Sequence, residues 1–419
     1  MMVKLAVEDS PAGSLPRRFL LSAPLWGMFA GALLMFGGEP LLETRWQPAT
    51  VALVHAFTLG VLGNTMFGSV LQFLPTAAGV RVRGGAALGH ALHGLFNAGV
   101  ILLLTGMLTG WRAGVSFAGV LLPAAFLLLG AMTLPGVLVA QGQRLLRTGI
   151  GLSLLSAMVA ALLGGCLALL LGGYLSMPPW PLIDAHAAWG TLGWIVLLLA
   201  SVARVVMPMF QGTLMMPSAA QMTWTNALML ALCVGTWRAL AYDDASWLEL
   251  ALILFVSVFA GGGLWLQRIS PRSRDGALLR SWRLGLMVLL LAAVALLFRI
   301  RNGLLAGALG LGVALPLLVN GMALEIVAFL GWIELHRRIG RGVQLPGVQR
   351  LLPETDKTRV LLAQIPLALL LPAAVLWPSA WLARLSGLAM LAAWCALWLA
   401  LTGVRRRSQR FALNLDPRS

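Results

Sequence analysis

Two histidines lie inside long apolar runs of the sequence, and both lie close to where their run begins. His55 is early in the run 49–74, and His186 is early in the run 181–210. If both runs are helices that start at the same surface, each imidazole lies roughly 8–9 Å below it at about 1.5 Å per residue. Ionisable side chains at such depth are costly in an apolar medium and usually face an interior site.

A neutral imidazole offers one nitrogen lone pair, and a hydrogen bond at its other nitrogen fixes the ring. Two imidazoles at one level on neighbouring helices have the donor set for axial ligation of a haem, with haem b as the expected form, or for a copper ion. Asp184 is the candidate partner that orients His186. The alternative is that His55 and His186 are hydrogen-bonded independently near a wet interface.

The remaining three histidines form weaker candidates. His90 and His93 are three residues apart and therefore share one face of a helix over 86–109, which makes them an alternative metal site. This run is expected to start at the opposite surface, some 20 Å from the level of His55. A hydrogen-bonding role near the headgroups is the alternative for this pair, and His336 is expected to be solvated at a helix end.

Three polar residues occupy similar places towards the far ends of long runs, namely Gln72, Arg204 and Glu325. If these three helices converge, Arg204 and Glu325 are expected to form an ion pair with Gln72 beside them, because an unpaired charge at this depth is costly. The alternative is that this polar ring lines a path for protons or ions.

The composition of the chain indicates the class of protein that holds these residues. Of 419 residues 59% are hydrophobic and only 11% are charged, and the mean hydropathy is +0.89. A soluble chain carries about twice that charged fraction, so a soluble enzyme and a nucleic-acid-binding protein are excluded. The three cysteines lie singly in apolar runs, which excludes a disulfide-stapled domain and a CxxC motif.

The apolar runs predict an all-α polytopic membrane protein with about twelve transmembrane helices, since helices satisfy their backbone in lipid. One membrane domain is expected over 19–404, between a segment 1–18 and a basic tail 405–419. Most of the 30 lysines and arginines fall in segments on the side of both termini, which predicts that both termini are cytoplasmic. The predicted spans are 19–38, 49–74, 86–109, 114–140, 148–174, 181–210, 221–241, 246–267, 281–298, 303–335, 360–377 and 382–404.

An internal repeat groups these spans in fours. Thr58-Leu59-Gly60 precedes Pro75, and Thr191-Leu192-Gly193 precedes Pro208 with the same offset (191 − 58 = 133 and 208 − 75 = 133). A weaker third copy begins at Glu325, with Ala328 in the place of the proline. Unless the match is a coincidence between apolar helices, it predicts three units near 19–140, 148–267 and 281–404, with spans two, six and ten innermost.

The segments His55-Ala-Phe-Thr-Leu-Gly60, Ala185-His186-Ala-Ala-Trp-Gly-Thr-Leu-Gly-Trp194 and Arg204-Val-Val-Met-Pro208 resemble the haem–copper oxidase subunit I superfamily in the broad sense. The chain is more closely similar to its twelve-span relatives, which include the NnrS-type haem- and copper-containing membrane proteins. The resemblance implies three arcs of four helices and a haem ligand at His55. The chain departs from it at span seven, which lacks histidine, and at Ala188, which replaces a second histidine.

Because of these departures, a complete oxidase or nitric oxide reductase is not expected, and no catalytic residue is assigned. The sequence predicts a bacterial-type inner-membrane protein that binds one haem, or copper, through His55 and His186. Its role would be accessory, in nitrogen-oxide stress, electron transfer or metal and cofactor handling. Its expected partners are the lipid bilayer and a redox or other membrane protein. The alternatives are a transporter of a small solute, ion or metal that uses the inner polar residues, and an assembly subunit without a ligand.

Overall fold

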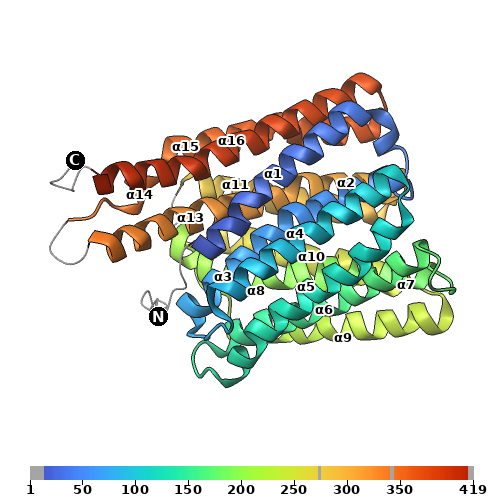
Figure 1. Cartoon of the computed structure of the whole chain (residues 1–419), viewed down its shortest axis with the longest axis horizontal. Coiled ribbons are helices and arrows are strands. Elements are labelled where there is room, and N and C mark those ends of the chain that lie inside the picture. Colours follow the sequence, from blue (N-terminus) through green and yellow to red (C-terminus); the bar gives the residue numbers. More distant parts are fainter. Residues whose placement is uncertain (1–13, 272–274, 340–343, 414–419) are drawn as a thin grey trace.

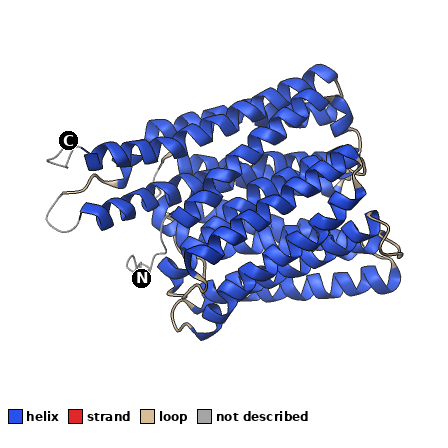
Figure 2. Ribbon diagram, viewed as in Figure 1, coloured by secondary structure: helices blue, strands red, loops and turns tan. Residues whose placement is uncertain are grey.

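The computed structural model describes residues 14–271, 275–339 and 344–413, and every regular element in these ranges is helical (Figures 1 and 2). Most elements are long, unbroken helices that run side by side along one direction. Their bounds are α1 Ser14–Gly37, α4 Gly85–Thr109, α5 Arg112–Val139, α6 Arg144–Leu171, α9 Ser218–Tyr242, α10 Ser246–Ile269, α11 Ala277–Leu297, α15 Glu354–Leu376 and α16 Ala380–Leu413, with a short α14, Val348–Leu351.

Three further rods are interrupted by π-helix, in which each turn holds one residue more than an α-helix. The first consists of α2 (Pro48–His55), η3 (Ala56–Gly63) and α3 (Asn64–Ala78). The second consists of α7 (Trp180–Ala188), η4 (Trp189–Val196), α8 (Leu197–Val206) and η5 (Met207–Gln211). The third follows a 3-10 turn, η6 (Ile300–Gly303), and consists of α12 (Leu304–Gly307), η7 (Ala308–Ala314) and α13 (Leu315–Ile339).

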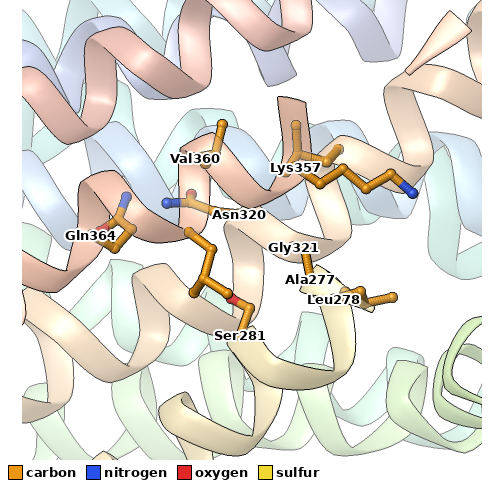
Figure 3. Close-up of a pocket in the computed structure, with 10 residues that line it drawn as sticks. Ala277, Leu278, Ser281, Asn320, Gly321, Lys357, Val360 and Gln364 are labelled. Carbon is orange, nitrogen blue, oxygen red and sulfur yellow. The ribbon is translucent and has the colours of Figure 1, made fainter. Parts of the chain in front are cut away.

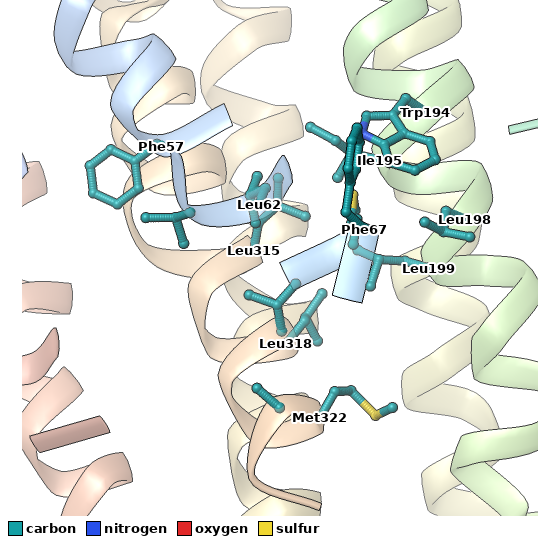
Figure 4. Packing of buried hydrophobic residues seen from close by; sticks show 14 of the residues in the cluster. Phe57, Leu62, Phe67, Trp194, Ile195, Leu198, Leu199, Leu315, Leu318 and Met322 are labelled. Carbon is teal, nitrogen blue, oxygen red and sulfur yellow. The ribbon is translucent and has the colours of Figure 1, made fainter. Parts of the chain in front are cut away.

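These three rods form the interior of the bundle. Within the most apolar window of each rod, 72%, 72% and 94% of the residues are buried, compared with 33–56% in the other apolar helices. Apolar side chains from all three meet in the centre, including Phe67 of α3, Trp194 of η4 and Leu318 of α13 (Figure 4). The rods expected to be innermost from the sequence are therefore the most buried.

Eleven helices in the described ranges are long and apolar enough to cross a bilayer. The predicted span 221–241 corresponds to α9. This helix is 25 residues long, but it is less apolar than the eleven helices counted above. It carries polar residues such as Gln221, Asn226 and Arg238, and it packs against α7 and α10. The all-α polytopic membrane fold is thus supported. Among the described residues, eleven helices are both long enough and apolar enough to cross a bilayer, compared with the twelve spans predicted.

The first and last helices pack against each other along their length, which brings the two ends of the chain together. A Cβ on Gly387 of α16 would lie 2.7 Å from the carbonyl oxygen of Gly31 in α1, so the backbones are in contact. Small residues allow such close approach between membrane helices. The start of α1 and the end of α16 lie at the same end of the bundle (Figure 1).

The structural boundaries differ slightly from the predicted ones. Helix α1 begins at Ser14 rather than at 19, and α16 continues to Leu413, past 404. Most of the predicted basic tail is thus the last two turns of a helix, since arginines are good helix formers. The rest of the predicted terminal segments, 1–13 and 414–419, lies outside the described residues.

Candidate functional site

The rings of His55 and His186 lie next to each other between the first two inner rods. Their centroids are 6.1 Å apart and their planes are within 16° of parallel. The starts of the same two rods also meet, because Trp46 and Trp180 pack edge to face with ring centroids 5.2 Å apart. The structure therefore brings together the two histidines that the sequence singled out.

Each ring is fixed by a hydrogen bond from Nδ1 to a backbone carbonyl. The acceptor for His55 is the carbonyl of Val51, one turn earlier in α2, at 2.8 Å. The acceptor for His186 is the carbonyl of Ala160 in the neighbouring helix α6, also at 2.8 Å. Because a carbonyl only accepts, Nδ1 carries the proton in both rings, and the lone pair of each neutral ring is on Nε2.

A glycine makes room for the second ring. A Cβ on Gly164 of α6 would lie 2.8 Å from Cε1 of His186 and 3.1 Å from its Nδ1. No ordinary side chain fits at that distance, so His186 can approach α6 only because residue 164 has no side chain. Gly164 lies one turn after Ala160, and α6 thus supplies both the hydrogen-bond acceptor and the space.

The separation of the two rings is that expected for two imidazoles that hold one metal between them. A metal–nitrogen bond of about 2.0–2.1 Å and ~1.1 Å from nitrogen to ring centre place two such centroids ~6.3 Å apart. The observed separation of 6.1 Å agrees with this value. Within the described ranges no group of three or more His, Cys, Asp or Glu side chains converges, so the donor set here is two nitrogens. Two axial nitrogens suit a haem iron, and two-coordinate binding suits monovalent copper.

The expected hydrogen bond from His186 to the carboxylate of Asp184 is not among those that the described residues form. The Nδ1 position is taken by the Ala160 carbonyl instead. The reason is helical spacing, since residues two apart point about 200° away from each other around an α-helix. Asp184 is half-buried one helical turn after Trp180, close to the start of the rod.

His90 and His93 lie apart from this site and do not act together. Nε2 of His93 is 2.9 Å from the hydroxyl of Ser22 in α1, and its ring packs on Phe19. His90 is exposed on the outer side of α4. His336 is also exposed and stacks on Trp332 with ring centroids 5.5 Å apart. The hydrogen-bonding alternative describes His93 better than a shared metal does.

The expected ion pair between Arg204 and Glu325 is not formed. The guanidinium of Arg204 donates to the carbonyl of Met216 at 2.6 Å and to Gln221 Oε1 at 2.9 Å, both of which follow it in the chain. Glu325 is 6% exposed and accepts from the ammonium of Lys357 in α15. Gln72 is buried in α3. Arg204 and Glu325 are thus not paired with each other, because each charge has a closer partner.

A polar cluster that the sequence reading did not identify lies between α11, α13 and α15, near Lys357 (Figure 3). Asn320 of α13 and Gln364 of α15 are 4% and 3% exposed, and the amide nitrogen of each has no hydrogen-bond partner among the described residues. They line a small cavity with Ser281 of α11 and with Lys357. The detectable signal was the spacing of Lys357 and Gln364, two turns apart on one helix face.

No protein-family model matches the sequence, and no curated protein matches it either.

Proposed function

We propose that this protein binds one haem, or a copper ion, between His55 and His186 and has an accessory redox or cofactor-handling role in a membrane. The observation that carries the proposal is the arrangement of the two rings, with centroids 6.1 Å apart and both lone pairs on Nε2. The resemblance to haem–copper oxidase-like proteins, including the NnrS type, is consistent with this proposal and suggests a link to nitrogen-oxide stress.

The residues of this chain hold and orient the group. The carbonyls of Val51 and Ala160 keep each imidazole in the tautomer that ligates and fix the orientation of its ring. A bound haem or copper would supply one-electron redox chemistry. His55 and His186 would hold the group through Nε2, and a haem held by two side chains of the protein would suit electron transfer better than reduction of a small molecule. A complete oxidase or nitric oxide reductase is not proposed.

We further propose that the protein lies in a bacterial-type inner membrane with both termini cytoplasmic and that α9 is a twelfth span. The distribution of lysine and arginine supports this orientation. A three-unit repeat is supported by the π-helical segments, since η3 and η4 begin and end with the offset found in the sequence motif (189 − 56 = 133 and 196 − 63 = 133). The third inner rod also contains a π-helical segment, η7.

The test is an absorption spectrum and metal quantification of the full chain purified from cells supplied with haem precursor and copper. We expect a Soret band or about one equivalent of copper in the wild type, and a loss of either in His55→Ala and His186→Ala. His90→Ala and His336→Ala are matched controls, because both residues are exposed away from the pair. A wild type without haem or copper, or unchanged loading of both test variants, would reject the proposal.

A second candidate function is a path for protons or small ions beside the third inner rod. It is favoured by the buried Glu325–Lys357 pair and by the unpartnered amides of Asn320 and Gln364. Buried polar groups without partners are rare and mark sites for water or a ligand. Glu354, which is 56% exposed, lies 3.8 Å from Lys357 and connects the cluster to the surface.

Proteoliposomes that contain a pH-sensitive dye test this candidate. A proton path predicts that the wild type dissipates a pH gradient faster than empty liposomes, and that Asn320→Leu and Gln364→Leu slow it several-fold. Gln141→Leu is the control, because Gln141 is exposed in the loop between α5 and α6. Equal rates for the wild type and empty liposomes would remove this candidate without affecting the haem proposal.

A further inference from the structure

A cleft opens at the end of the bundle where α1 starts and where α13 and α16 end. Charged side chains from all three helices form its rim: Arg17 of α1, Glu334 and Arg338 of α13, and Arg405 of α16. Its floor is apolar and buried, with Val327, Gly331, Leu335 and Val404. The cleft thus has one charged part and one apolar part.

The rim carries an excess of positive charge. Glu334 is the only carboxylate among the described residues that line the cleft, and two arginines share it. One of its oxygens lies 2.5 Å from Arg17 and the other 2.7 Å from Arg338. Arg405 is exposed and forms no ion pair with a described residue. Three guanidinium groups face one carboxylate, so an anionic group can bind without displacing Glu334.

The floor extends the cleft towards the interior of the membrane. From Arg338 to Val327 the lining follows α13 over about three helical turns, or roughly 16 Å at 1.5 Å per residue. Gly331 lets α13 and α16 approach each other closely at the floor, because a Cβ there would lie 3.0 Å from Val404 of α16. The side chains change from charged to apolar along the same direction as a phospholipid changes from headgroup to acyl chain.

We propose that this cleft is a binding site for an anionic phospholipid, with the phosphate at Arg405 and Arg338 and the first part of an acyl chain against the apolar floor. Guanidinium groups bind phosphate through paired N–H donors. Basic pockets between membrane helices are suited to anionic headgroups. The lipid would connect α1, α13 and α16, and therefore the third inner rod to both ends of the chain.

The experiment is a thermal-unfolding titration of the delipidated full chain in detergent with phosphatidylglycerol, phosphatidylcholine or inorganic phosphate. We expect phosphatidylglycerol to raise the melting temperature, and the other two to have little effect. Loss of one arginine at the headgroup should weaken the apparent affinity about fivefold, so this loss is expected for Arg405→Gln. Arg338→Gln is a second test variant at the same rim.

Arg384→Gln is the matched control, since Arg384 is exposed at the other end of α16. Its titration should equal that of the wild type. Stabilisation by phosphatidylcholine equal to that by phosphatidylglycerol would overturn the proposal, as would wild-type affinity in both rim variants. Equal stabilisation by inorganic phosphate would show that the rim binds the anion alone and that the apolar floor contributes nothing.

Discussion

His55 and His186 face each other with nearly parallel rings although they are held by different parts of the fold. His55 is fixed by its own helix through Val51, whereas His186 is fixed by the neighbouring helix α6 through Ala160. The separation of 6.1 Å between the ring centroids thus depends on how α6 packs against α7 as well as on the two histidines. Residues of α6 should accordingly affect the site without contacting a ligand.

Gly164→Ala should lower haem or copper loading while both histidines are retained. The added Cβ would lie 2.8 Å from Cε1 of His186, so the ring must move away from α6 and from the Ala160 carbonyl. The measurement is the metal or Soret content per protein. Gly261→Ala is the control, since a Cβ there meets nothing within 4 Å. Equal loading of the two variants would show that haem or copper binding does not depend on the close packing of His186 against α6.

Breaking the buried ion pair of Glu325 and Lys357 should strongly destabilise the protein. Each single change, Glu325→Gln or Lys357→Met, leaves the other charge buried without its partner, at a cost of about 3–5 kcal/mol. The double variant should be more stable than the sum of the single effects predicts. Unfolding of the three variants in mixed micelles forms a double-mutant cycle, and strict additivity would show that the two side chains do not interact.

Gly387→Val should separate α1 from α16. The Cβ of any residue at position 387 would lie 2.3 Å from the backbone nitrogen of Met35 and 2.7 Å from the Gly31 carbonyl oxygen. The larger, branched side chain of valine therefore cannot be accommodated. We expect a loss of about 1–3 kcal/mol or more, as for other overpacked positions, measured as a lower melting temperature in detergent. Gly94→Val serves for comparison, because the space around Gly94 is open, and it should melt near the wild type.

Asp244 should make stability depend on pH in the acidic range. The hydroxyl of Ser246 and the guanidinium of Arg238 lower the pKa of Asp244 to about 2, from 3.8. The charged form is thus favoured in the folded state, and the stabilisation is fully present above about pH 5. It is lost as the pH falls through 4 towards 2. The melting temperatures of the wild type and Asp244→Asn should differ at pH 6, and the difference should shrink from pH 5 downwards and vanish only below about pH 2; a constant difference would contradict this.

Much of the fold could be predicted because burial in lipid imposes long apolar helices. Two of the three innermost rods were identified from the spacing of Thr58 and Pro75 relative to Thr191 and Pro208, and the third from the weaker copy at Glu325. The length and apolarity of α9 identify it as a membrane span less clearly than those of the other helices, since its polar residues lower its hydropathy. The pairing of α1 with α16 was not predicted, because glycine contacts such as Gly31 with Gly387 leave no distinctive pattern in a chain with 47 glycines.

The site was predictable in part. His55 and His186 were identified because histidine is rare in apolar runs, but their partners are backbone carbonyls, which carry no sequence signal. Pairing Arg204 with Glu325 assumed that their helices converge and neglected nearer partners. Lys357 was treated as part of a cytoplasmic segment, although it lies in the first turn of α15 and its side chain is only 12% exposed.

The π-helical segments have a consequence for how this chain tolerates insertions and deletions. Each holds a surplus residue per turn, so removing one residue from η3 would convert part of it to α-helix rather than break the rod. Because the wider turn already takes up the surplus residue, the part of the rod after the deletion would keep nearly its original direction relative to His55. The same deletion in a regular α-helix would turn everything after it by about 100°, since an α-helix has 3.6 residues per turn.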